Sequence, residues 1–161
     1  MSKPMGAIPP GFGSDAGMLT IGGRRVDALV AEAGDTPLFV YDLGLVRGRI
    51  ARFRAAFPDV KLHYAVKANP CEQLLRAIVK SVDGLDVASA GELRLALAAG
   101  ADPRTISFAG PGKRDGDLAE AIGAGVTLNC ESEGEAERAI AIGARLGRGP
   151  RTEERPPARR R

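Results

Sequence analysis

The strongest constraint on the fold is a recurrence of about 21 residues between positions 60 and 146. Strand-like runs end near Lys67, Ala88, Ala109 and Cys130, and each leads into a stretch with apolar residues at helical spacing. Alternating strands and helices of this kind are typical of parallel βα units with right-handed crossovers. We therefore expect an α/β fold.

The repeat predicts strands over 60–66, 84–87, 105–108 and 126–129 and helices over 72–80, 91–99, 115–124 and 133–146. Two architectures fit: a doubly wound open sheet and part of a (β/α)8 barrel. The periodicity does not distinguish them. In both, the chemistry collects at the carboxyl ends of the strands, which here are residues 67–70, 88–91, 109–113 and 130–132.

Residues 1–21 form a leader rich in Pro and Gly that ends in a short strand at Met18–Ile21. Three elements are expected between this leader and the repeat. They are a helix over Arg24–Ala33 ended by Gly34, a strand over Leu38–Tyr41, and a helix from the cap Asp42 to Phe57.

Composition excludes several classes of protein. At 161 residues, 44% of them hydrophobic, the chain suits one modest domain and is too short for most two-domain enzymes. No apolar run approaches the roughly 18–20 residues of a membrane-spanning helix, and the first residues lack a secretory signal, so we expect a cytoplasmic protein. The spacing of Cys71, Cys130 and His63 predicts reduced thiols and no metal site.

Residues 147–161 break the repeat and predict a disordered tail rich in Arg and Pro. The segment 145–161 holds seven arginines against two glutamates, so the net charge of +3 comes from the tail and the rest of the chain is slightly acidic. A nucleic-acid-binding module that uses this tail is an alternative. The acidic body and the absence of aromatic residues from the tail disfavour it, and we expect no nucleic-acid or membrane partner.

Lys67 carries the clearest chemical signal. It closes a strand in which His63, Ala65 and Lys67 point to one face, at the edge where the chemistry is expected. A lysine withdrawn from water at that edge is a usable nucleophile toward an aldehyde, which suggests Schiff-base chemistry. The alternative is a strand-end lysine whose ammonium simply reaches solvent.

Three motifs follow one another in the chain: Thr36–Asp42, His63–Pro70 and Gly84–Leu93. Together they resemble the fold-type III pyridoxal-phosphate-dependent decarboxylases, the ornithine, diaminopimelate and arginine decarboxylase family. The match covers roughly residues 22–146. The leader and Phe108–Asp115 further resemble the diaminopimelate-decarboxylase-like members found beside exosortase systems.

The resemblance implies that Lys67 holds pyridoxal 5'-phosphate as a Schiff base, while an amino-acid substrate loses its carboxylate as carbon dioxide. Asp86 and Glu92 match acidic family residues near that lysine and are predicted to bind the cofactor. Ser89 and Glu92 also fit a capping box, which is an alternative role for both. The family's stacking histidine lies further along the chain, so His63 is expected to be a packed core residue.

The same resemblance implies the N-terminal part of a TIM-type barrel, about four of eight βα units, with the strand over Leu38–Tyr41 belonging to a missing C-terminal β-domain. The expected domains are 1–21, 22–146 and 147–161. We interpret the change near Arg148 as a truncation in which the tail is out of frame. Such a fragment is expected to be inactive alone, with unpaired edges at its first and last strands, and the parent enzyme to be a homodimer.

Two other functions on the same fold remain open: a non-catalytic carrier of pyridoxal phosphate and an amino-acid racemase. Asp86 and Gly91–Leu93 favour a decarboxylase over the carrier, whereas Lys67 does not exclude a racemase. The segment Gly110–Lys113 lacks the spacing of a phosphate loop and predicts a turn before a helix. The alternative is that Lys113 and Arg114 face the mouth of the cleft.

Overall fold

The structure, a computed structural model, describes residues 6–152 of the chain. The chain divides into two units, Met1–Ala56 and Phe57–Arg161. All the large side chains that are fully buried in the described residues belong to the second unit. The hydrophobic core, and any site built on it, therefore lies within that unit.

The first unit contains a small antiparallel sheet and two helices. Its strands are β1 (Gly13–Asp15), β2 (Met18–Ile21) and β3 (Arg24–Arg25), followed by α1 (Val26–Ala33). The predicted strand at β2 is confirmed, and Gly34 ends α1 as predicted, with a φ of 81° that glycine adopts readily. Arg24 and Arg25 differ from the prediction because they pair with β2 instead of starting the helix.

The segment Leu38–Tyr41, predicted as a strand, has no regular secondary structure. Phe39 is 81% exposed, so its ring packs against no core in the described residues. The structure differs from the prediction here because a strand needs a hydrogen-bonded neighbour, and no described strand pairs with this segment. Helix α2 (Leu43–Ala56) begins after Asp42 as predicted, since Asp42 Oδ1 accepts hydrogen bonds from the backbone at its first turn.

The second unit alternates strands and helices as predicted. Its strands are β4 (His63–Ala65), β5 (Gly84–Val87), β6 (Ile106–Phe108), β7 (Thr127–Leu128) and β8 (Arg151–Thr152). Its helices are α3 (Glu72–Ile78), α4 (Ala90–Ala98), α5 (Asp115–Ala124) and α6 (Glu133–Leu146), with the 3-10 turns η1 (Val66–Ala68) and η2 (Pro103–Thr105). Helices α5 and α6 have the predicted bounds.

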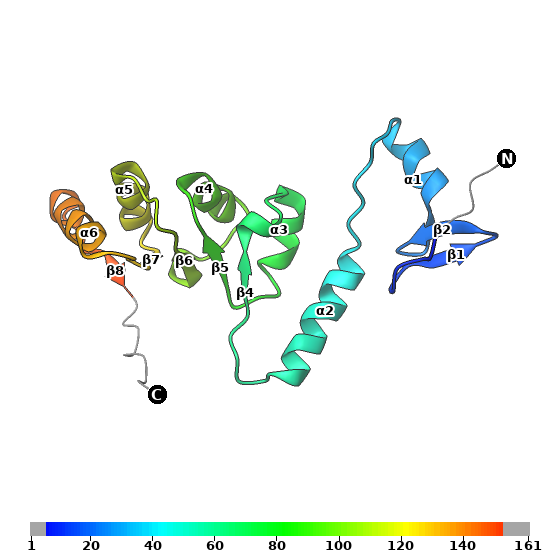
Figure 1. Ribbon diagram of the computed structural model, residues 1–161, viewed down its shortest axis with the longest axis horizontal. Helices are drawn as coiled ribbons and strands as arrows, with labels where there is room; N and C mark the ends of the chain where they lie inside the picture. Colours follow the sequence, from blue (N-terminus) through cyan, green and yellow to red (C-terminus); the bar gives the residue numbers. More distant parts are fainter. Residues whose placement is uncertain (1–5, 153–161) are drawn as a thin grey trace. The chain divides into compact units, whose positions relative to one another are not determined.

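The strand order distinguishes the two architectures that the periodicity left open. All neighbours pair in parallel, and the order β4-β5-β6-β7-β8 is the order of the chain. Right-handed crossovers between successive neighbours place all the helices on one face, whereas a doubly wound sheet reverses its order. In Figure 1, α4, α5 and α6 follow one another on the same side of the strands. The arrangement is that of consecutive units of a (β/α)8 barrel.

The register gives the sheet two different faces. Ala65, Asp86, Ser107 and Thr127 align across four strands, and this face is polar or small. The alternate positions point the other way, toward the helices, and are apolar. They form the core with residues of the helices, the largest fully buried side chains being Phe108, Leu75, Leu85, Leu93, Ile106, Leu118, Ile122, Leu128, Val66, Val87 and Val126.

Strand β8 lies in the segment predicted to be a disordered tail. Arg151 and Thr152 pair in parallel with Thr127 and Leu128, and both are exposed. The structure differs from the expectation because pairing at a sheet edge uses backbone groups and does not require apolar side chains. The β7 edge, predicted to be unpaired, is therefore covered at these two residues, while residues 153–161 of the predicted tail lie outside the described residues.

Candidate active site

A cavity of about 390 Å³ lies at the carboxyl ends of strands β4 to β7. It is lined by residues from the strand ends and the loops that follow them: Ala65, Lys67, Asp86, Val87, Ala88, Glu92, Ser107, Ala109, Gly110, Asn129 and Glu131. The lining includes Lys67, Asp86 and Glu92, the three residues predicted for the cofactor site. The structure thus brings the predicted residues together at the predicted edge of the sheet, and their roles stay predictions.

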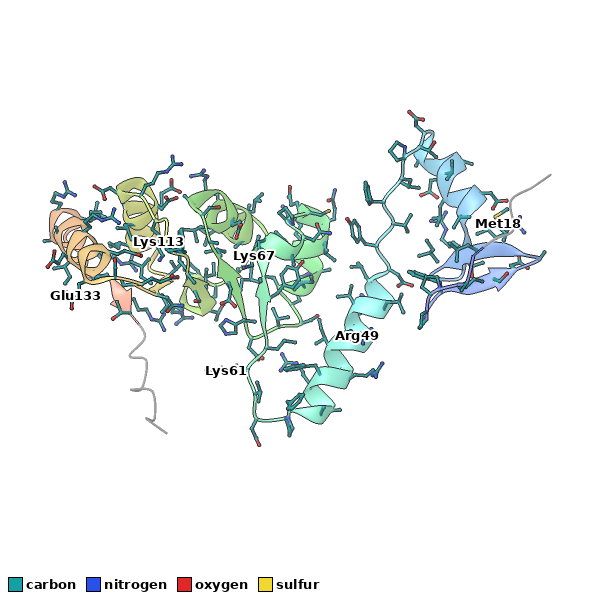
Figure 2. All side chains as sticks on the ribbon, viewed as in Figure 1. Met18, Arg49, Lys61, Lys67, Lys113 and Glu133 are labelled. Carbon is teal, nitrogen blue, oxygen red and sulfur yellow. The ribbon has the colours of Figure 1, made fainter. Side chains whose placement is uncertain are left out.

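Lys67 lies in the turn η1, beyond the end of strand β4 at Ala65. Figure 2 shows it beside β4 and β5. Of the two predicted environments, Lys67 has that of the alternative, a lysine that reaches solvent: it is exposed, and among residues 6–152 no hydrogen bond or ion pair involves its side chain. This exposure fits the position of β4 at the edge of the sheet, where none of the described strands pairs with its outer side. Its amine is therefore available to a ligand in the cavity.

Asp86 lies in β5 next to Ala65 and presents its carboxylate on the polar face. Its Oδ1 lies 3.3 Å from His63 Nδ1. Gly84 leaves the space for the imidazole ring, because a Cβ at this position would lie 2.6 Å from His63 Cε1. His63, predicted to be a packed core residue, is instead half-buried against a carboxylate that can still accept a further donor from the cavity.

Glu92 lies in the first turn of helix α4, whose N-cap is Ser89. Its Oε2 accepts a hydrogen bond from Ala88 N at 2.9 Å, and Ser89 Oγ accepts one from Glu92 N at 3.2 Å. The predicted capping role of Ser89 is confirmed, whereas Glu92 bonds to the residue before the N-cap and not to Ser89 N as a capping box requires. Glu92 also lines the cavity, so its other carboxylate oxygen remains for the predicted cofactor role.

Ser107, Asn129 and Glu131 form the side of the cavity opposite Lys67 in strand order, and the sequence analysis did not single them out. Asn129 Nδ2 donates to Ser107 Oγ at 3.0 Å, and Gly110 N donates to Glu131 Oε1 at 2.6 Å. The signal for Ser107 and Asn129 was their position on the alternating polar face at the strand ends. Together these hydrogen bonds join the strand end of β7 and its loop to β6 and the loop after it.

Lys113 is buried, and the alternative that it faces the cleft mouth is wrong. Its side chain is 1% exposed, and its Nζ donates to Gly110 O at 2.7 Å, Asn129 O at 2.8 Å and Glu135 Oε1 at 2.5 Å. It also lies 5.9 Å from the centre of the Phe108 ring, on the helix side of the sheet. The predicted turn before a helix at Gly110–Lys113 is confirmed.

Asp117 links the two helices that begin at this edge. Its Oδ2 accepts from Arg114 N and its Oδ1 from Ala90 N, both at 3.0 Å. The hydrogen bond from Arg114 N, helped by that from Ala90 N and opposed by burial, lowers the pKa of the Asp117 carboxyl below its ordinary value near 3.8. The starts of α4 and α5 are therefore held by one ionised carboxylate.

The described residues contain no group of three or more His, Cys, Asp and Glu side chains that could hold a metal ion. Within the same residues, no helix is both long enough and apolar enough to cross a membrane. The cysteines Cys71 and Cys130 are free thiols, as predicted.

Comparison with known proteins gives matches over most of the chain. Residues 43–145 match the family described as pyridoxal-dependent decarboxylase, pyridoxal binding domain. A diaminopimelate decarboxylase of Aquifex aeolicus is 37% identical over 120 residues, which are 74% of this chain and 29% of that protein. A diaminopimelate decarboxylase of Mycobacterium leprae is 38% identical over 135 residues, 83% of this chain and 28% of that protein. The chain thus spans about three tenths of the length of these relatives.

Solved structures match in the same way. A crystal structure from Aquifex aeolicus superposes with a TM-score of 0.82 at 35% identity, over 89% of this chain and 36% of that one. Diaminopimelate decarboxylase from Helicobacter pylori, complexed with L-lysine, gives a TM-score of 0.71 at 30% identity, over 78% and 33% of the two chains. The family match covers more than half of the chain and includes the cavity with its lysine, and the chain belongs to the pyridoxal-dependent decarboxylase family, whose cofactor is pyridoxal phosphate.

Proposed function

We propose that Lys67 forms the Schiff base with pyridoxal phosphate and that the chain supplies the lysine side of an amino-acid decarboxylase site. The observation that carries the proposal is the exposed amine of Lys67 in a cavity at the carboxyl ends of parallel strands, with Asp86 and Glu92 in the same lining. Ligands of α/β folds bind at this end of the strands.

The residues of the cavity fit the aldehyde end of the cofactor. Lys67 provides a primary amine, and the carboxylates of Asp86, Glu92 and Glu131 suit the positive charge of amino groups. Lys67 is also the only cationic side chain among the lining residues, so this lining does not provide a clamp for the phosphate. The fit is therefore to the reacting carbonyl and to the substrate amine.

When bound, pyridoxal phosphate supplies an electron sink for the charge left on the substrate α-carbon. Lys67 would hold the group through its primary amine. Asp86 and Glu92, in the lining of the same cavity, would bind an amino group of the substrate or the lysine when it is not bonded to the cofactor. These carboxylates would hold such an ammonium inside the cavity.

The substrate class follows from the relatives, which are named diaminopimelate decarboxylases, and we propose an amino acid of that kind with a second amino group. We further propose that these 161 residues alone do not catalyse decarboxylation, because the described cavity lacks a phosphate clamp. Release of carbon dioxide from diaminopimelate by the purified chain, above the rate in buffer with free cofactor, would contradict this second part only.

The test of the proposal is to incubate the chain with pyridoxal phosphate, reduce with borohydride and locate the modified lysine by mass spectrometry. We expect the adduct on Lys67, and a visible imine absorbance that disappears in Lys67→Ala. Lys61→Ala is the matched control, because Lys61 is an exposed lysine just before β4 and is absent from the cavity lining.

The two variants separate specific from random labelling. Equal adduct and absorbance in wild type and Lys67→Ala would overturn the proposal, as would a loss in Lys61→Ala as large as that in Lys67→Ala. The resemblance to members found beside exosortase systems, the domain limits 1–21, 22–146 and 147–161, and the homodimer of the parent enzyme stay predictions.

A further inference from the structure

The most unusual side chain in the second unit is Lys113, a charged residue withdrawn from water but not part of the cavity lining. Its side chain is 1% exposed and that of its partner Glu135 is 3% exposed. A buried ammonium is costly unless all its donors are satisfied. Lys113 Nζ has three hydrogens and three acceptors, which are Gly110 O, Asn129 O and Glu135 Oε1.

Two of the three acceptors belong to the wall of the cavity. Gly110 follows β6 and Asn129 follows β7, and both line the cavity, whereas Lys113 does not. The other polar groups of Gly110 and Asn129 reach the cavity side, where Gly110 N donates to Glu131 Oε1 and Asn129 Nδ2 donates to Ser107 Oγ. Lys113 thus binds the carbonyl groups of two backbone segments whose other polar groups form the wall of the cavity.

Glu135 fixes the position of Lys113 from helix α6. Ser132 Oγ accepts from Glu135 N at the start of this helix, so the carboxylate projects from a capped first turn. Arg138, one turn further along α6, donates to Lys113 O at 3.0 Å and to Asp115 Oδ1 at 2.6 Å. The backbone and the ammonium of Lys113 are therefore both held by α6, which links this helix to the wall.

Stability alone is a weak reason for such a pair. Replacing a buried ion pair with apolar residues of similar volume is often neutral or stabilising, because the two charges pay a large desolvation cost. What an apolar pair cannot replace is the hydrogen bonding to the two carbonyls, which has a direction and a length. The geometry therefore favours a role in placing these carbonyls.

We propose that Lys113 is a positioning residue for the cofactor site: its buried ammonium sets the wall formed by Ser107, Asn129 and Glu131 opposite Lys67. This inference rests on the proposed binding of pyridoxal phosphate at Lys67. Lys113 touches neither cofactor nor substrate and acts through the carbonyls of Gly110 and Asn129.

The test compares three variants of the full chain by thermal unfolding and by affinity for pyridoxal phosphate. The double variant Lys113→Met with Glu135→Leu removes the carbonyl contacts but keeps apolar volume, and Glu135→Gln removes the charge but keeps an oxygen acceptor. The matched control is Arg94→Met with Glu120→Leu, which removes an exposed ion pair between α4 and α5. Its pair is worth little to stability.

We expect the double variant to change the affinity for pyridoxal phosphate but not the unfolding temperature, and Glu135→Gln to do the reverse. The double variant should unfold near the wild-type temperature but bind pyridoxal phosphate roughly tenfold more weakly, the effect of losing about one charged hydrogen bond. Glu135→Gln should unfold at a lower temperature but bind as wild type at temperatures where it is folded. The control should change neither property.

Wild-type affinity in a folded double variant would overturn the inference. If the double variant does not fold, Glu135→Gln decides it: this variant keeps Lys113 and its two carbonyl contacts, so an affinity below that of wild type at temperatures where it is folded would contradict the inference. Amide exchange gives the comparison without cofactor: the Gly110 amide, bonded to Glu131 in the wall, should lose protection in the double variant and not in the control. Unchanged exchange of the Gly110 amide in the double variant would contradict the inference, whether or not Lys67 forms the adduct.

Discussion

Lys67 and Lys113 both follow strands of the same parallel sheet, at the same end, yet their surroundings are opposite. Lys67 follows β4, is exposed, and has no recorded partner among residues 6–152. Lys113 follows β6, is buried, and has every ammonium hydrogen engaged. The difference fits the proposed Schiff base at Lys67, which needs an amine without a bond to the protein, whereas a structural amine must have all its donors satisfied before it can be buried.

The largest expected effect comes from removing one member of the buried pair. Lys113→Met removes the cation that pairs with the buried Glu135 side chain, and we expect a loss of about 3–5 kcal/mol in the free energy of unfolding. Lys67→Met removes an exposed amine and should change it by less than about 0.5 kcal/mol. Urea unfolding followed by circular dichroism measures both, and equal losses in the two variants would remove the contrast between the lysines.

A smaller effect on the free energy of unfolding is expected at Gly84, the first residue of β5. A Cβ at this position would lie 2.3 Å from Thr105 O and 2.6 Å from His63 Cε1, and the first of these atoms is backbone. Gly84→Ala should therefore cost about 1–3 kcal/mol in unfolding free energy, since β5 and β6 must move apart.

Gly91→Ala provides the control for Gly84, because a Cβ there meets only Ser89 Oγ at 3.7 Å and the position is helical. We expect it to be neutral or slightly stabilising. An unchanged free energy of unfolding in Gly84→Ala would mean that β5 can move away from Thr105 and His63 at little cost. The strands around Lys67 would then be less rigid than the contrast between the two lysines assumes.

The repeat predicted this fold well because strands and helices differ in apolar period, and α5 and α6 have the predicted bounds. Strand β4 is shorter than predicted. Its predicted first residues, Val60–Leu62, precede the register with β5, and Leu62 N donates to Asp83 Oδ2 instead of continuing the ladder. The period of apolar residues in one strand does not show at which residue its pairing with the neighbouring strand begins.

The site was predictable where it depended on strand ends and not where it depended on side-chain partners. Lys67 was predicted from its strand end, and Asp86 and Glu92 from the family resemblance, and all three line one cavity. The same Ser-x-x-Glu spacing occurs at Ser89–Glu92 and Ser132–Glu135, but Glu92 bonds back to Ala88 N whereas Glu135 turns to Lys113. The sequence around each Ser-x-x-Glu motif does not distinguish the two roles of the glutamate, because the partner of Glu135 is Lys113, 22 positions away in the sequence.

A pH-dependent effect is expected at Asp117, which lies between the regions of the two lysines. Its folded-state pKa is lowered, chiefly by the hydrogen bond from Arg114 N, so its stabilisation is fully present above the unfolded-state pKa near 4 and is lost as the pH falls through the folded-state pKa. Asp117→Asn should cost roughly 1 kcal/mol at pH 7 and flatten the loss of stability in acid.

Asp115→Asn is the control for Asp117, since Asp115 is exposed in the same first turn and pairs with Arg138 at the surface. Unfolding by urea at pH 7, 5 and 3 measures the two variants. If Asp117→Asn keeps the acid sensitivity of the wild type, the carboxylate does not join α4 to α5 in the way that its two backbone hydrogen bonds indicate.

The smallest effect is expected at Cys130, a partly buried thiol close to the Lys113–Glu135 pair. Burial raises the pKa of this thiol, the charge of Glu135 raises it further, and the charge of Lys113 opposes them. In a Cys71→Ser background, Glu135→Gln should therefore speed the reaction of Cys130 with an aromatic disulfide about two- to threefold at pH 8. The paired charges act on the thiol in opposite directions, so removal of the Glu135 charge leaves that of Lys113, which lowers the thiol pKa. A slower reaction in Glu135→Gln would mean that Lys113 is reoriented when its counter-charge is removed, and the saturated amine would then be less fixed than its three hydrogen bonds imply.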